Sequence, residues 1–239
     1  MPTIRTGAAT SSLHSGTIEY QGDAGLRGRE TWSITCADDG TRTLQAHCRM
    51  FDSRVERWVV HTVDADLRPL RSFVSQRKGG TFLGEGWFVL EDGVLTGESR
   101  TPGEGTVRRT VRLDGPLDYF VPHAVSGDSW ITPCYDRAAS GWQEVRNGFT
   151  TSLLPDGSTG PAIEQHRGIR QRLVGEEEVT VPAGTYRTQH FVVSPRLDVE
   201  EHLWVTDDDA AMLVRLRSDR LTTTYVLTEH RVEALWPIC

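Results

Sequence analysis

The chain has 239 residues, a formal net charge of −7, and a composition that is 37% hydrophobic and 25% charged. Such a composition is ordinary for a soluble globular protein, and the length is sufficient to bury one full core. The acidic balance argues against a general nucleic-acid binder, because phosphate binding needs a basic surface. No apolar stretch approaches the roughly 18 residues of a membrane span.

Short runs of alternating or β-branched residues predict fifteen strands. In chain order they lie near 17–21, 28–37, 42–51, 56–64, 70–77, 81–90, 94–100, 106–113, 143–153, 163–174, 176–181, 185–194, 199–206, 211–218 and 221–232. Turn sequences such as Asp39-Gly40 and Asp92-Gly93 separate them. Segment 117–142 breaks this rhythm, and we expect it to hold a helical turn or a long loop.

The pattern predicts an all-β protein, either a single antiparallel, strongly curved sheet or a lipocalin-like β-barrel with one irregular mid-chain segment. Curvature or closure shields the edges that so many strands would expose. We expect residues 1–16 to form a flexible N-terminal tail and residues 17–239 to form one barrel-like domain, with 117–142 as an irregular cover. Whether the barrel closes, and whether it holds a cavity or is filled by side chains, stays open.

The four cysteines, Cys36, Cys48, Cys134 and Cys239, show no metal-binding spacing. A two-residue turn at Asp39-Gly40 places Cys36 opposite Thr43, so we expect no bridge to Cys48 and reduced thiols. The N-terminus has no hydrophobic run, which favours a cytoplasmic protein. A periplasmic location is the alternative if a leader peptide has been removed.

The stretch EEEVTVPAGTYRTQHFVV, followed by EEHLWVTDDDAAMLVRLRS and TTTYVLTEHR, resembles a large bacterial family of unknown function with a V-P-A-G-[TS]-[FY] hairpin. The similarity covers about 175–231, and GPLDYF at 115–120 resembles the mid-chain element of that family. The resemblance implies a curved antiparallel, lipocalin-like half-barrel whose members are usually exported. It implies no activity.

Two groups of polar residues are candidates for acid/base chemistry. If Val181 lies opposite Tyr186 in the VPAG hairpin, His190 lies opposite Glu177 on an apolar face, where a carboxylate can tune a histidine base. The alternative is a structural His–Glu pair.

The second group lies in the irregular segment, where Asp118, Tyr119 and His123, with Asp128 and Tyr135, can form a cluster over a barrel mouth. The alternative is a cover loop whose aromatic side chains simply pack.

Aromatic residues are the candidates for ligand binding, because indole, phenol and imidazole rings suit apolar or aromatic molecules. They are Tyr186, Trp58, Trp87, Trp130, Tyr135, Tyr225 and His61. The alternative is that these rings fill a wide core.

The sequence contains no nucleophile elbow, phosphate-binding loop or metalloprotease motif. We therefore expect no metal, no cofactor and no nucleic-acid partner. The favoured function is a lipocalin-like protein that encloses a small hydrophobic or aromatic molecule. The first alternative is a cofactor-independent acid/base enzyme, namely an isomerase, hydratase or dehydratase, lyase or cyclase. The second alternative is a structural protein with a filled core. The oligomeric state stays open.

Overall fold

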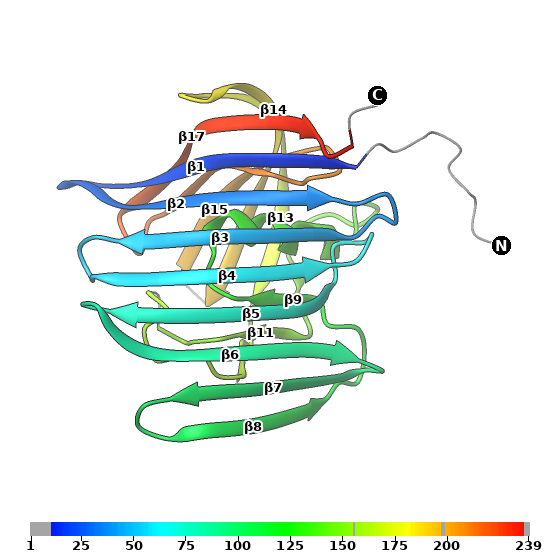
Figure 1. The fold of residues 1–239 in the computed structure, drawn as a ribbon. Helices are drawn as coiled ribbons and strands as arrows, with labels where there is room; N and C mark the ends of the chain where they lie inside the picture. Colours follow the sequence, from blue (N-terminus) through cyan, green and yellow to red (C-terminus); the bar gives the residue numbers. More distant parts are fainter. Residues whose placement is uncertain (1–10, 155, 197–198, 237–239) are drawn as a thin grey trace.

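The computed structural model describes residues 11–154, 156–196 and 199–236, and its regular secondary structure is almost entirely β-strand (Figure 1). The all-β prediction is confirmed. Within these residues one helix occurs, the 3-10 helix η1 (Val125–Cys134). It lies in the segment where a helical turn or loop was expected. No helix in this part of the chain is long and apolar enough to cross a membrane.

Fourteen strands form one antiparallel sheet that curls on itself, so that β1 to β8 face β13 to β17 across the interior (Figure 1). In spatial order the strands are β10 (Gln143–Glu144), β13 (Arg170–Val181), β14 (Gly184–Arg196), β15 (Val199–Thr206), β16 (Leu213–Ser218), β17 (Thr223–Ala234), β1 (Ser12–Gly22), β2 (Gly25–Cys36), β3 (Arg42–Met50), β4 (Val55–Val63), β5 (Pro69–Lys78), β6 (Thr81–Glu91), β7 (Val94–Thr101) and β8 (Gly105–Arg112). In the described residues β10 and β8 are the two edges, so the sheet is strongly curved and open.

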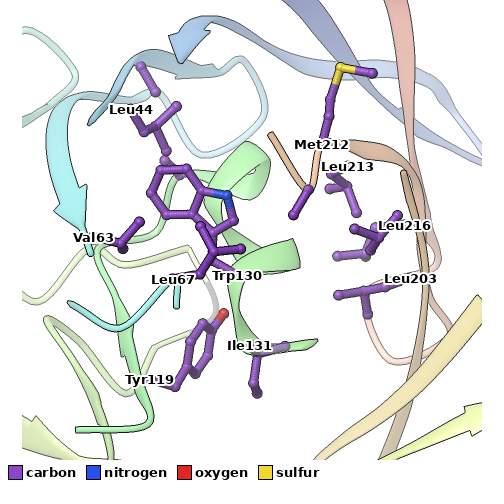
Figure 2. Packing of buried hydrophobic residues seen from close by; sticks show 14 of the residues in the cluster. Leu44, Val63, Leu67, Tyr119, Trp130, Ile131, Leu203, Met212, Leu213 and Leu216 are labelled. Atoms are coloured by element: carbon purple, nitrogen blue, oxygen red, sulfur yellow. The ribbon is translucent and has the colours of Figure 1, made fainter. Parts of the chain in front are cut away.

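The concave side of this sheet is occupied by the described residues 117–154 and 156–169, apart from β10, and these residues are called here the inner segment. It contains η1 and a small sheet of β12 (Glu164–Gln165), β11 (Gly148–Thr150) and β9 (Tyr119–Val121). The two facing halves of the curled sheet, β1 to β8 and β13 to β17, are called here its two walls. Trp130 of η1 lies between side chains of these walls, and its Nε1–H donates to the Ala210 carbonyl at 3.2 Å. Figure 2 shows Leu44 and Val63 on one side of it and Leu203 and Leu216 on the other. The inner segment therefore supplies the middle layer of the core.

Three strand predictions differ from the structure. Strand β1 begins at Ser12, inside the expected tail, because its backbone pairs with β2 on one side and β17 on the other without needing an apolar pattern. The predicted strand 143–153 forms only β10 and β11, since the chain turns there into the inner segment. The predicted strands 163–174 and 176–181 are largely one strand, β13, with a bulge before Gly175.

The register of the β2–β3 hairpin is also corrected. Cys36 lies opposite Arg42 and not Thr43, because the turn has three residues and ends at Gly40, whose φ is 83°. Left-handed backbone of this kind favours glycine. Cys36, Cys48 and Cys134 are free thiols, and Cys239 lies outside the described residues.

In the VPAG hairpin Val181 lies opposite Gly184 and not Tyr186, because only Pro182 and Ala183 form the turn. A shift of two residues leaves every side chain on its predicted face. His190 is consequently opposite Gly175, but its Nδ1 still lies 3.0 Å from Glu177 Oε1.

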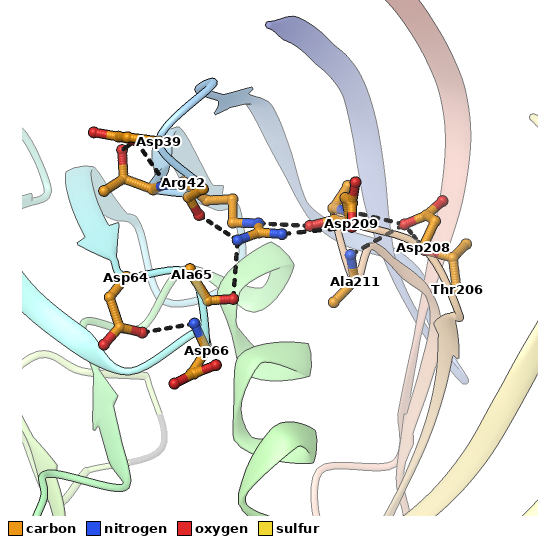
Figure 3. A network of polar contacts seen from close by, with 12 residues as sticks. Asp39, Arg42, Asp64, Ala65, Asp66, Thr206, Asp208, Asp209 and Ala211 are labelled. Atoms are coloured by element: carbon orange, nitrogen blue, oxygen red, sulfur yellow. Dashed lines mark hydrogen bonds and ion pairs between the residues drawn. The ribbon is translucent and has the colours of Figure 1, made fainter. Parts of the chain in front are cut away.

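One end of the curl is held together by the buried Arg42 at the start of β3 (Figure 3). Its guanidinium donates to the carbonyls of Asp209 at 2.6 Å and Ala65 at 3.1 Å, and to that of Gly40. The Arg42 guanidinium therefore connects three turns, which come from both walls of the curled sheet. Met50 is at the opposite end of β3, and the cavity described next lies toward that end.

Candidate functional site

A cavity of about 350 Å³ lies between the inner segment and the two walls of the curled sheet. This volume falls within the range of roughly 300–1,000 Å³ typical of small-molecule sites. Its apolar lining comes from both walls and the inner segment, and includes Val121, Ile131, Ile169, Val193, Leu203 and Leu216. The cavity is therefore a space inside the core.

The cavity opens at the turns beyond Met50. Its lining there includes the exposed side chains of Asp52, Leu153, Leu154, Arg196 and Arg220. These residues form the mouth.

Two carboxyl groups line the cavity, one from η1 and one from the sheet. Asp128 projects from η1 and accepts a hydrogen bond from the Tyr119 hydroxyl at 3.1 Å. Glu201, on β15, accepts one from the Ser218 hydroxyl at 2.9 Å. Burial raises the pKa of both groups, and the nearby Glu201 raises that of Asp128 further. Both side chains retain accessible surface, which at this depth faces the cavity.

Tyrosine rings surround these acids. Tyr20 and Tyr225 meet edge to face with ring centroids 4.8 Å apart, and both line the cavity, as does Tyr119. Burial raises the pKa of Tyr225, and the charges of Glu201 and Asp128 add to this shift. Tyr119 and Tyr225 therefore lie beside the two acids in the cavity, whereas the hydroxyl of Tyr20 donates to Glu30.

Glu30 fixes the position of η1, although it does not line the cavity. Its carboxylate is fully buried and accepts hydrogen bonds from the backbone N–H groups of Val125 and Ser126, both at 2.9 Å. It also accepts from the hydroxyls of Tyr20, at 2.9 Å, and Ser126. The N-terminus of η1 has no cap from its own Ala124 side chain. The carboxylate of Glu30 supplies that cap from β2.

Arg57, on β4, ties three segments together beside the cavity. Its buried guanidinium donates to Gln76 Oε1 at 3.3 Å, to the His123 carbonyl at 2.7 Å and to the Asp156 carbonyl at 2.5 Å. The His123 ring donates from Nε2 to the Ser152 carbonyl at 3.0 Å. Burial, with the Arg57 charge as second cause, lowers the pKa of His123 to about 3. The imidazole is therefore neutral at pH 7.

The structure places four members of the predicted sets at the cavity, namely Tyr119, His123, Asp128 and Tyr225. Asp118 lies nearby in the chain but not at the cavity. Its carboxylate accepts from the backbone N–H groups of Arg146 at 3.1 Å and Asn147 at 3.3 Å.

His190 and Glu177 lie outside the cavity lining. They contact His202 and Trp204, with Trp204 Nε1 donating to Glu177 at 2.5 Å and His190 Nε2 lying 2.9 Å from His202 Nδ1. Burial lowers the pKa of His190 despite the opposing effect of Glu177.

The other predicted ligand-binding aromatics are distributed over the molecule. Trp58 and Trp87 are exposed on the outer surface, 37% and 61% respectively, while Trp130 and Tyr135 are buried in the core. Tyr186 lies beside His230, with its hydroxyl 3.2 Å from Nδ1 of that histidine. His61 is buried beside Phe120 and Trp130.

Sequence reasoning missed Glu30, Arg57 and Glu201, although strand alternation contains the signal for each. Glu30 shares the face of Trp32 and Ile34, and Arg57 shares the face of Val55 and Val59. Glu201 likewise shares the face of Leu203. A charged residue at an inward position of a strand is the pattern that would have identified them.

In the described part of the chain, no group of three or more His, Cys, Asp or Glu side chains is arranged to hold a metal ion.

Comparison with solved structures finds a similar fold in a protein of a family of unknown function. The chain is similar to a β-barrel-like protein of domain of unknown function DUF1849 from Brucella abortus, with 10% identity, a TM-score of 0.56, and coverage of 95% of this chain and 99% of that one. A DUF1089 family protein from Pseudomonas aeruginosa also has 10% identity, with a TM-score of 0.44 and coverage of 77% and 87%. No family model and no curated protein matches the chain. The first likeness supports the β-barrel-like fold but does not show the family that the V-P-A-G motif resembles.

Proposed function

We propose that this protein binds a small, mostly apolar molecule in the cavity between the inner segment and the curled sheet. The observation that carries the proposal is a cavity of about 350 Å³ that has a mouth and is lined by apolar side chains together with convergent polar groups. Protein interiors pack as densely as organic crystals and leave few voids larger than a water molecule. A space of this size in an otherwise filled core therefore points to an occupant.

The polar groups of the cavity favour an acid/base enzyme as a second candidate. Carboxyl groups with raised pKa values are suited to proton transfer near neutral pH. Asp128, with Tyr119 bonded to it, occupies such a position in the cavity. His123 is less suited, because its Nε2–H is held by Ser152 and its pKa is lowered to about 3. His190 and Glu177 would act only on a molecule outside the cavity.

The binding proposal is tested with the apolar dye Nile red and two matched leucine variants. Leu216 and Leu227 are both buried, but only Leu216 lines the cavity. We expect Nile red fluorescence to increase and saturate with the native protein. Leu216→Phe should reduce dye affinity at least about tenfold, because the larger ring takes up cavity volume. Leu227→Phe should leave dye affinity unchanged, although overpacking should lower the stability of that variant by about 1–3 kcal/mol.

The proposal is contradicted if Nile red does not bind saturably, or if it binds equally to the native protein and to Leu216→Phe. Native mass spectrometry of the protein purified from a bacterial host provides a second readout. A bound molecule that is present in the native protein and absent from Leu216→Phe would support the cavity as its location.

A further inference from the structure

Two carboxyl groups are among the polar groups that remain free in the cavity lining. Asp128 and Glu201 have one protein hydrogen bond each, through one carboxyl oxygen. In the described residues neither has an Arg, Lys or His partner within ion-pair distance. Glu30 differs from these two acids, because both of its carboxyl oxygens accept hydrogen bonds from the surrounding protein.

The cations near the cavity are already engaged or lie at its rim. The Arg57 guanidinium donates to three neutral oxygens and is only 2% exposed. Arg27 is paired with Asp52 at 2.7 Å and also donates to the Leu221 carbonyl at 2.7 Å. Arg196 and Arg220 are exposed at the mouth. An anionic group of a ligand would therefore find free cationic partners only at the mouth. A ligand group that reaches the interior of the cavity would instead contact the carboxyls of Asp128 and Glu201.

Three tyrosine rings complete the surroundings of these acids. Tyr20, Tyr119 and Tyr225 line the same cavity. Aromatic faces attract organic cations, and recognition of ammonium groups by rings together with carboxylates is favourable where water is excluded. The tyrosines are an observation independent of the acids, and both indicate the same ligand charge.

Resting on the proposed binding function, we propose that the ligand is an amine, with its protonated nitrogen between Asp128, Glu201 and the tyrosine rings and its apolar body against Ile131, Leu203 and Leu216. The ammonium provides the missing countercharge, so binding lets a protonated carboxyl ionise and give its proton to the buffer. Burial raises the pKa of both carboxyls and so favours their protonated form when no cation is bound.

The test compares three probes that share an octyl chain, namely octylamine, octanol and octanoate, by calorimetric titration and displacement of Nile red. We expect octylamine to bind at least about tenfold more tightly than octanol, and octanoate more weakly than octanol. Titration in two buffers with different heats of ionisation should show proton release on octylamine binding. Octanol should show none.

Asp128→Asn and Glu201→Gln are the test variants, because each removes a charge and keeps the side-chain size. Each should reduce octylamine affinity at least about tenfold and reduce octanol and Nile red affinity much less. Retained dye binding also shows that the variant is folded. Glu177→Gln is the control, since this glutamate lies outside the cavity, and it should bind octylamine as the native protein does.

The outcomes separate the two proposals. If octanol or octanoate binds as tightly as octylamine, or if both variants retain full octylamine affinity, the amine proposal is wrong and the binding proposal stands. If neither Nile red nor any octyl compound binds, both are wrong.

Discussion

The buried carboxylate of Glu30 positions η1, which lines part of the cavity. Its carboxylate takes two backbone N–H groups at the start of η1, and Tyr20 donates to the same carboxylate from the sheet. Without it, those N–H groups would be buried and unpaired, which is costly. The geometry of η1, and with it the direction of Asp128, depends on this residue.

Glu30→Gln should lower the free energy of unfolding by about 3 kcal/mol, because the amide NH₂ cannot accept and would face backbone donors. Urea unfolding measures the change. Glu19→Gln is the control, since Glu19 forms a surface ion pair with Arg29, and surface pairs contribute about 1 kcal/mol at most. Equal stability of the native protein and Glu30→Gln would show that Glu30 does not hold η1.

His61 should make the protein less stable in acid. Burial lowers its folded-state pKa from 6.5 to about 4. As the pH falls, His61 gains its proton in the unfolded chain before it does so in the folded protein. The contribution of neutral His61 to the free energy of unfolding is therefore complete above pH 6.5 and is lost as the pH falls toward 4. The loss approaches about 1.4 kcal/mol per pH unit. The raised pKa values of Asp128 and Glu201 act in the opposite direction, because their contribution is lost as the pH rises.

A His61→Phe variant isolates this effect, because it keeps a ring beside Trp130 and cannot bind a proton. We expect its free energy of unfolding to change less between pH 6.5 and 4 than that of the native protein. A native-like slope in His61→Phe would contradict burial of a neutral His61.

At the scale of elements, glycines on β6 and β7 let the inner segment approach the sheet. A Cβ atom at Gly97 would lie 2.7 Å from Cδ1 of Ile163 and 2.9 Å from Phe88, and one at Gly84 would lie 2.9 Å from Pro161. Real Cβ atoms essentially never approach this closely. These positions therefore carry no side chain because residues 160–163 pack directly on the strand backbone.

Gly97→Ala should consequently destabilise the protein by about 1–3 kcal/mol through overpacking. Adding Ile163→Val removes the clashing Cδ1 atom and should recover part of that loss in a double-mutant cycle. Gly103→Ala is the matched control, since nothing lies within 4 Å of the added methyl group. Additive effects of the two substitutions would contradict the contact between β7 and the inner segment.

Most of the sheet could be predicted from the sequence, whereas the inner segment could not. Strands such as β3 alternate cleanly, with Leu44, Ala46 and Cys48 buried. The inner segment contains few paired residues and takes its shape from long-range contacts, for example Glu30 with Ser126. Local patterns do not contain such contacts. The same limit applies to the site, since Tyr119, His123, Asp128 and Tyr225 were candidates but Glu201 was not.

For the whole molecule, the open sheet requires ties across its interior, and the two arginines at its ends provide them. Arg42 links three turns at the end away from the mouth. Arg57 links β4 and β5 to the inner segment on both sides of the small sheet, through His123 and Asp156. Its guanidinium is therefore expected to hold the mouth of the cavity in shape.

Arg57→Met tests this role, because methionine keeps an apolar stem in the core but leaves the carbonyls of His123 and Asp156 without their donor. The three lost charged hydrogen bonds outweigh the relief from burying one charge less, so we expect the free energy of unfolding to fall by about 2–4 kcal/mol. Backbone amides of residues 156–160 should exchange with deuterium at least about tenfold faster, while those of β13 to β17 change less. Arg108→Met, which breaks an exposed pair with Glu98, should alter neither quantity. Unchanged exchange near Asp156 in Arg57→Met would mean that the mouth is held by other contacts.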